Sequence, residues 1–96
     1  MKFRFHSKAE EEFNKAIDYY EESKERLGLE FAQEIHATIR RIVDHPLAWS
    51  FMTKTTRRCL TNRFPFGIIY AIAEQEIIIV AIMHQNKKPD YWKTRE

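Results

Sequence analysis

The hydrophobic residues at the start of the chain recur first at every second position and then at helical spacing. Residues 2–6 alternate, with Phe3 and Phe5 on one face, which predicts a short strand. From Ser7 onward, apolar residues recur at i, i+3, i+4 and i+7, which predicts a helix with one face in a core. The segment Ser-Lys-Ala-Glu is typical of a capping box that starts at Ser7, and Gly28 is predicted to end the helix.

A second amphipathic helix is predicted over residues 30–45. Pro46 disfavours a helical conformation at the preceding residue and therefore marks its end. Because only a residue or two separate the two predicted helices, they are expected to fold back on each other as an antiparallel hairpin. The predicted buried stripe of the second helix is Phe31, Ile35, Ile39 and Ile42.

Three later apolar runs predict strands at 57–61, 66–73 and 76–83. The last two runs are apolar on both faces, which is typical of central strands, and the pair Glu74-Gln75 is predicted to form the turn between them. The stretch before the first of these strands has no clear periodicity. The pattern therefore predicts a single α+β domain over 1–96 with the order β-α-α-β-β-β, in which a helical hairpin packs on a small antiparallel sheet.

Composition supports one packed domain and excludes several classes of protein. Of 96 residues, 44% are apolar, which is enough for one core, and the two glycines exclude a glycine-rich phosphate-binding loop. The single cysteine, Cys59, fits a buried strand position in a reducing compartment. No apolar run approaches the length of a membrane helix, and the basic N-terminus has no signal-peptide pattern. A cytoplasmic protein is expected.

Charge is unevenly distributed along the chain. The net charge is +2, but residues 1–48 hold 8 Lys or Arg against 10 Asp or Glu, and residues 49–96 hold 8 against 4. The carboxylate run at 10–12 is interpreted as a solvated helix face. The basic second half is compatible with a polyanionic partner or with an acidic protein segment.

The late part of the chain holds the candidate chemistry. The four histidines and the cysteine show no metal-ligand spacing, and no cofactor motif is present, so neither a metal nor a cofactor is expected. Arg63 and Phe66 are predicted to approach His84 across the last hairpin. Cations there could hold phosphates while the imidazole acts as an acid or base in metal-free RNA cleavage. The alternative is structural: His84 bonds to backbone, Trp92 pins the tail to the sheet, and the cations are solvated.

Four segments, 16–21, 27–31, 64–70 and 84–95, resemble the RelE/ParE superfamily of toxins from type II toxin–antitoxin systems. They span nearly the whole chain in the family's order. The resemblance implies a bacterial or archaeal toxin that a small antitoxin, encoded beside it, holds inactive. The Phe-Pro-Phe strand and the Pro-Asp-Tyr-Trp tail are most similar to the ParE-like, plasmid-stabilisation branch.

The two branches of this superfamily imply different targets. RelE-like members cut messenger RNA on the ribosome without a metal, and the corresponding catalytic residues here would be Arg58, Arg63 and His84. ParE-like members poison DNA gyrase. Ribonuclease members commonly carry an arginine at the position of Gly67, and some carry a tyrosine at the position of Gln85. These departures favour the ParE-like branch.

The leading hypothesis is therefore a ParE-like toxin that inhibits growth by binding a macromolecular target, with DNA gyrase as the expected one. One alternative is a metal-independent, ribosome-dependent mRNA endoribonuclease, and another is an inactive relative that serves as a binding module. The antitoxin is expected to bind beside the helical hairpin, on Tyr19, Leu27 and Leu29, which lie off the main apolar stripe. The toxin and the antitoxin could then form a hetero-oligomer. The residues predicted to bind the target are Lys54, Lys87, Lys88, Tyr91, Trp92 and Arg95.

Overall fold

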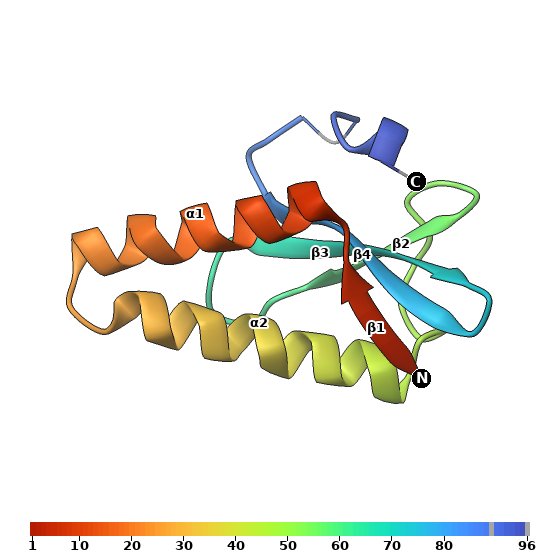
Figure 1. Cartoon of the computed structure of the whole chain (residues 1–96), viewed down its shortest axis with the longest axis horizontal. Helices are drawn as coiled ribbons and strands as arrows, with labels where there is room; N and C mark the ends of the chain where they lie inside the picture. The colour runs from red at the N-terminus through yellow and green to blue at the C-terminus, as the bar shows by residue number, and fades with distance from the viewer. Residues whose placement is uncertain (89, 96) are drawn as a thin grey trace.

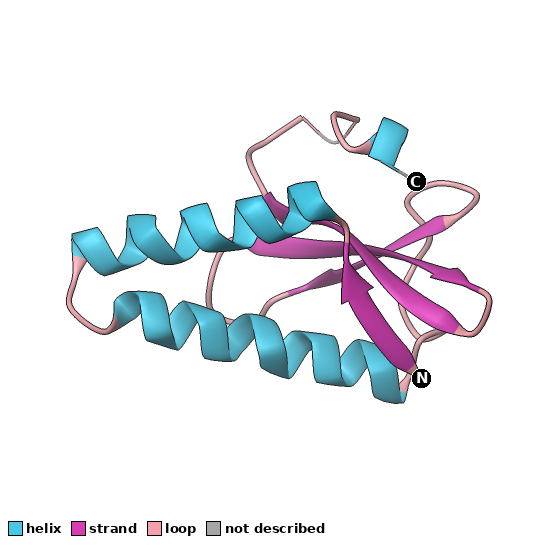
Figure 2. Cartoon of the chain, in the orientation of Figure 1, coloured by secondary structure: helices cyan, strands magenta, loops and turns pink. Residues whose placement is uncertain are grey.

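The predicted order of elements is confirmed by a computed structural model that describes residues 1–88 and 90–95 (Figures 1 and 2). The class is α+β. A short 3₁₀ helix near the C-terminus was not predicted. None of the described helices is long and apolar enough to cross a membrane. The elements are β1 (Lys2–Phe5), α1 (Ser7–Ser23), α2 (Leu27–Asp44), β2 (Thr56–Leu60), β3 (Phe66–Ala73), β4 (Glu76–His84) and η1 (Lys93–Arg95).

The sheet has the strand order β1-β4-β3-β2 and is mixed. β2, β3 and β4 are antiparallel neighbours, as predicted, and Glu74 and Gln75 form the turn between the last two with φ values of 52° and 66°. β1 pairs with β4 in parallel, with Lys2 opposite Glu76. The prediction of a wholly antiparallel sheet fails only at β1, because no hairpin joins that strand to its neighbour and the helical hairpin intervenes.

Each face of the two central strands is covered by a different part of the chain. The helices cover one face, where Phe31 and Ile35 of α2 meet Ile68 and Tyr70 of β3 in the larger core cluster. The tail, residues 85–88 and 90–95, covers the other face, in a second cluster centred on Trp92. Because both faces of β3 and β4 are covered, both are apolar. Sequence periodicity predicted the cover by the helices but not the cover by the tail.

The start of α1 differs from the predicted capping box. His6, not Ser7, is the N-cap: its Nδ1 accepts a hydrogen bond from the Lys8 amide at 3.0 Å, and its carbonyl accepts from the Glu10 amide. Ser7 is the first residue of the helix. The His6 imidazole therefore accepts the hydrogen bond from the first turn of the helix that a serine or threonine hydroxyl usually accepts.

The junction between the helices also differs from the prediction. α1 ends at Ser23, and Gly28 lies in the first turn of α2 instead of ending α1. The left-handed residue of the connection is Arg26, with φ 71°. The Glu21 carboxylate holds it there, because its two oxygens accept from the backbone amides of Arg26 and Gly28 at 2.9 and 3.0 Å. This carboxylate supplies the acceptor that the start of α2 needs.

Gly28 is required for the close approach of the two helices, and not for its backbone conformation. A Cβ added at this position would lie 2.6 Å from the carbonyl oxygen of Ile17 in α1. That oxygen belongs to the backbone, so the helices would have to separate to accept any side chain. The glycine thus fixes how tightly the hairpin closes.

Candidate functional site

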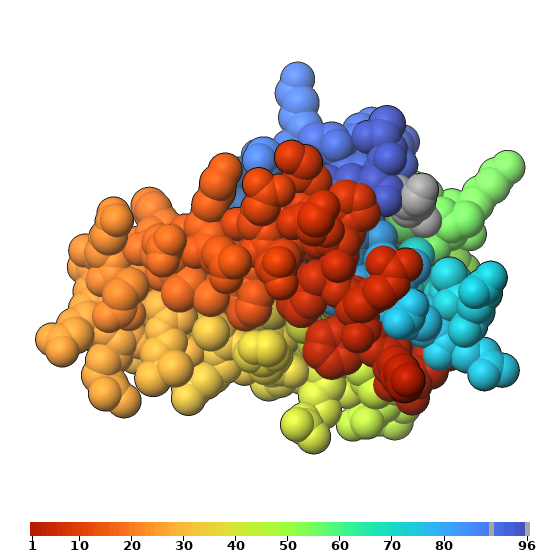
Figure 3. All heavy atoms as spheres, in the orientation of Figure 1, coloured from red at the N-terminus to blue at the C-terminus, as the bar shows by residue number. Residues whose placement is uncertain are grey.

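A groove of about 560 Å³ runs between α1 and the tail, at the end of β4 where His84 lies. We call it the α1–tail groove. In Figure 3 the tail lies against the first half of α1. The lining of the groove is mainly apolar and includes tyrosine and phenylalanine rings, with a lysine contributed by the helix and another by the tail. Its walls include Lys15, Tyr19 and Tyr20 of α1, Phe66 and His84 of the sheet, and Lys87 and Tyr91 of the tail.

His84 is the last residue of β4 and lies opposite Phe66 of β3, as the predicted hairpin requires. The two rings meet edge to face with centroids 5.2 Å apart. The Nδ1 atom accepts a hydrogen bond from the Asn86 amide at 3.0 Å. An acid or base role would therefore have to use Nε2, because Nδ1 is engaged by the backbone.

The three residues required for a nuclease lie on separate surfaces. Arg58 of β2 pairs with Ile69 and packs over Gly67, where its Cγ lies 3.3 Å from the position of an added Cβ. Ile69 belongs to the cluster beneath the tail, whereas Phe66, beside His84, belongs to the cluster beneath the helices. Directly opposed residues share a face and neighbours along a strand alternate, so Arg58 and His84 lie on opposite faces of the sheet.

Arg63 lies at a third place. Its guanidinium pairs with Glu30 of α2, and its backbone amide donates to Glu34 of the same helix at 3.4 Å. The hydrogen bond and the charge of Arg63 lower the pKa of Glu30. Arg63 does not line the α1–tail groove, and of the two residues predicted to approach His84 only Phe66 is observed beside it. The carboxylates at the start of α2 draw this loop toward the helix, and sequence spacing gave no sign of that contact.

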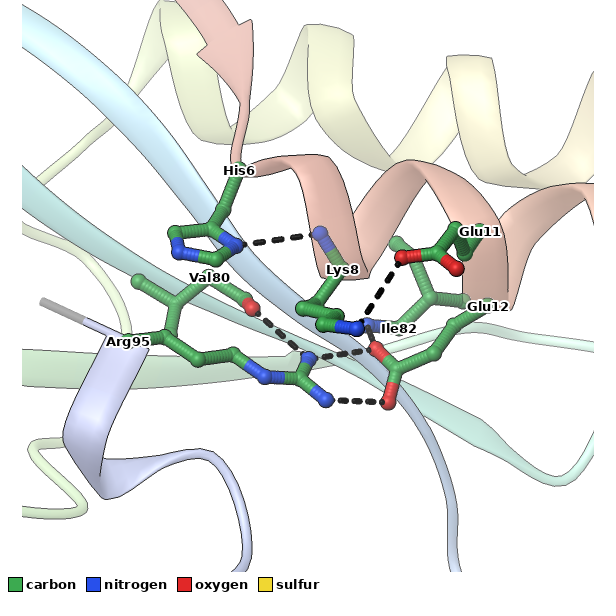
Figure 4. Close-up of polar contacts among 7 residues, drawn as sticks. All are labelled: His6, Lys8, Glu11, Glu12, Val80, Ile82 and Arg95. Atoms are coloured by element: carbon green, nitrogen blue, oxygen red, sulfur yellow. Dashed lines mark hydrogen bonds and ion pairs between the residues drawn. The ribbon is translucent and has the colours of Figure 1, made fainter.

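Trp92 and Arg95 hold the tail to the protein. Trp92 is 1% exposed and packs in the cluster beneath the tail. Arg95 donates to both oxygens of Glu12 at 2.9 and 3.1 Å and to the Val80 carbonyl at 3.1 Å, while Glu12 also accepts from the Ile82 amide (Figure 4). This contact joins α1, β4 and the tail. Both residues were predicted to contact a target, but Trp92 is buried and Arg95 is mostly buried, and both hold the tail in place. For Trp92 this is the structural alternative considered from the sequence.

The other predicted target contacts are accessible. Lys54, Lys87 and Lys88 are exposed, and the Lys87 ammonium lies 4.6 Å from the centroid of the Tyr91 ring. Tyr91 is half-buried in the wall of the groove. Burial, and secondly the nearby Glu12 carboxylate, raise the pKa of its hydroxyl well above the usual value. Lys54 lies elsewhere, in the loop before β2.

The residues predicted to bind an antitoxin differ in exposure. Tyr19 is 66% exposed on α1 and Leu29 is 48% exposed on α2. Leu27 is half-buried against the core and presents less surface. Tyr19 also lines the α1–tail groove, so the exposed patch on the hairpin continues into the groove.

Sequence reasoning missed Glu12, which is the main polar contact between α1 and the tail. It was interpreted as part of a solvated carboxylate run, yet its side chain is only 17% exposed. One local signal was available. Glu12 lies four residues before Ala16 and next to Phe13, at the border of the buried stripe of α1.

The family model for the ParE toxin of the type II toxin–antitoxin system parDE matches residues 3–89. Among solved structures, a chromosomal ParDE TA system from P. aeruginosa aligns with a TM-score of 0.77 and 20% sequence identity, over 88% of this chain and 95% of that one. At that identity the likeness shows a shared fold. A search of curated proteins gave no match. Because the family model covers most of the chain, this protein belongs to the ParE toxin family of type II toxin–antitoxin systems.

Proposed function

We propose that this chain inhibits growth in the cytoplasm by binding a macromolecular target, DNA gyrase, and that a cognate antitoxin neutralises it. Family membership supports the class of toxin. The observation that carries the choice of target is the separation of Arg58, Arg63 and His84 onto three surfaces.

Metal-free RNA cleavage needs its acid or base within hydrogen-bond reach of the reacting group, with the phosphate-binding cations beside it. Here the sheet itself lies between Arg58 and His84, and Arg63 is paired with a carboxylate. Gly67 adds no charge at the strand position between them. The accessible groups at the α1–tail groove are aromatic rings and lysines, which suit binding to a macromolecule.

Pulse labelling just after induction of the chain without an antitoxin tests this proposal. We expect DNA synthesis to fall before protein synthesis. Early loss of protein synthesis would instead support the ribosome-dependent endoribonuclease. Growth that is indifferent to expression would support the third reading, an inactive relative that serves as a binding module.

Replacing His84 with alanine is expected to leave growth inhibition within about twofold of the parent, because the imidazole is not needed as an acid or base. An endoribonuclease that used it would lose about 10²-fold or more in cleavage. The measurement is plating efficiency at matched expression, together with cleavage of a ribosome-bound message. His45→Ala, which removes an exposed imidazole at the end of α2, is the matched control.

We also infer that the antitoxin covers the helical hairpin beside the α1–tail groove, since Tyr19 and Leu29 expose apolar surface there. Tyr19→Ala is expected to weaken antitoxin binding by about tenfold, the loss of one good interface anchor. Leu47→Ala removes an equally exposed apolar side chain far along the chain and serves as the control. Unchanged hydrogen exchange over residues 19–29 in the complex would contradict this placement.

A further inference from the structure

The segment without sequence periodicity is residues 47–56, and all of it except Thr56, the first residue of β2, lies in the loop between α2 and β2. Phe51 makes an isolated bridge to Arg57, and the Ser50 carbonyl accepts from the Arg58 amide at 3.1 Å. The Met52 amide donates to the Thr56 carbonyl at 2.8 Å. These backbone hydrogen bonds hold the loop to the edge strand β2, yet the Phe51 ring is 59% exposed.

Arg57 fixes the position of this exposed ring. Its guanidinium carbon lies 3.8 Å from the centroid of the Phe51 ring. The same guanidinium donates to the carbonyls of Leu47 and Trp49 at 3.2 and 2.7 Å. A side chain that is held in place before a partner arrives loses little conformational entropy on binding.

The ring forms one wall of a second cavity, of about 250 Å³, at the β2 edge of the sheet. Two of its lining residues are cations, and none of those that the structure describes is an acid. Ile72 adds an aliphatic side chain that is 36% exposed. We call this surface the Phe51 platform; it consists of Phe51, Lys54, Thr55, Arg57, Tyr70 and Ile72.

The chemistry of the platform selects its partner. Lysine and arginine complement carboxylates, and the exposed aromatic and aliphatic side chains complement an apolar side chain. Arg57 already covers one face of the Phe51 ring, and an aliphatic group such as that of Ile72 offers no stacking surface to a base. The combination therefore favours a protein segment over a nucleic acid.

Position separates the platform from the hairpin assigned to the antitoxin. In Figure 1 the loop before β2 lies beside the C-terminal end of the chain, away from the connection between α1 and α2. Met52 of this loop packs with Trp92 of the tail in one cluster. The loop that carries Phe51 and Lys54 thus also contacts the tail, through Met52.

We propose that the Phe51 platform binds an acidic segment of the target protein that presents an apolar side chain. This inference rests on the proposed function, in which the target is a protein. Lys54 of this loop was already predicted to contact the target, and Phe51 is added to it as a second contact outside the tail. The inference also gives the target a contact apart from the helical hairpin that we assign to the antitoxin.

Binding of the purified chain to purified DNA gyrase tests the proposal, with Phe51→Ala as the main variant. The dissociation constant is expected to rise about tenfold or more, as for an interface hot spot. Lys54→Glu is expected to weaken binding and to reduce its salt dependence. Phe3→Ala is the matched control, because that ring is 40% exposed on β1 at the opposite edge of the sheet, and it should bind as the parent does.

The outcomes separate this inference from the function on which it rests. If the parent chain does not bind gyrase, the proposed target is wrong and the inference falls with it. If the parent binds gyrase and both Phe51→Ala and Lys54→Glu bind it as tightly as the parent, the proposed role of the Phe51 platform is wrong and the proposed target stands. If Phe51→Ala instead abolishes binding of a single-stranded oligonucleotide and spares gyrase, the platform is a nucleic-acid site. Thermal melting and antitoxin capture that match the parent show that each variant is folded.

Discussion

Replacing Trp92 with alanine is expected to lower the free energy of unfolding by about 3–5 kcal/mol, the usual cost of truncating a buried tryptophan. The side chain is 1% exposed and fills the space between the tail and the sheet, against residues such as Ile69 and Met83. Alanine would leave a cavity that the short tail cannot fill without leaving the sheet. Water would then reach the face of β3 and β4 that the helices do not cover.

Thermal or urea unfolding followed by circular dichroism measures the effect of this change. For a chain of this size, a loss of that magnitude lowers the melting temperature by about 12 °C or more. Trp92→Phe is the control, because it keeps most of the apolar contact and removes the Nε1–H group, which is buried without a hydrogen-bond partner among the described residues. It should cost about 1.5 kcal/mol or less, as a conservative apolar exchange does. Equal stability of Trp92→Ala and the parent would show that the tail does not depend on this side chain.

Replacing Arg95 with alanine is expected to lower the free energy of unfolding by about 2–4 kcal/mol, because a mostly buried carboxylate loses its cationic partner and keeps the Ile82 amide, and the Val80 carbonyl loses a donor. The side chains of Arg95 and Glu12 are only 13% and 17% exposed. The Arg95 guanidinium makes three hydrogen bonds, two to Glu12 and one to the Val80 carbonyl. Chemical denaturation gives the change in free energy directly.

Lys93→Ala provides the matched control for the loss of one positive charge from the tail. Lys93 pairs with Asp90 at 3.3 Å, but these side chains are 53% and 74% exposed, so the change should cost about 0–1 kcal/mol. In a double-mutant cycle, Glu12→Ala and Arg95→Ala should cost less together than the sum of the two single changes. Additive effects would mean that the two groups do not interact in solution.

Patterns with a local period were predicted well from the sequence. The bounds of β3 were predicted without error, and the buried stripe of α2 is the predicted one. Both follow from the spacing of apolar residues that are close together in the sequence. The caps were predicted poorly. Two side chains outside the usual capping patterns, His6 and Glu21, supply the acceptors at the starts of the two helices.

The candidate site was predicted only in part, for a physical reason. An aromatic or a cation in a short polar tail has the same sequence signature whether it contacts a partner or the protein's own sheet. Trp92 and Arg95 turn inward because their contacts, the second face of the sheet and Glu12, lie far away along the chain. Likewise, the pairing of Arg63 with Glu30 depends on tertiary structure alone. The exposure of Tyr19, in contrast, followed from its place off the helical stripe.

Contacts between residues far apart in the chain also set when this fold can be completed during synthesis. β1 needs β4 as its neighbour, and Glu12 needs Arg95, which is 83 residues away. Contacts of such long sequence separation form only when both partners are available. The helical hairpin ends at residue 44, whereas the sheet can form only once β4, which ends at His84, is available, and the Glu12 contact only once Arg95 is available. Synthesis is thus followed by a folding step, and on the antitoxin placement that we propose, its binding surface on the hairpin is made before that step is complete.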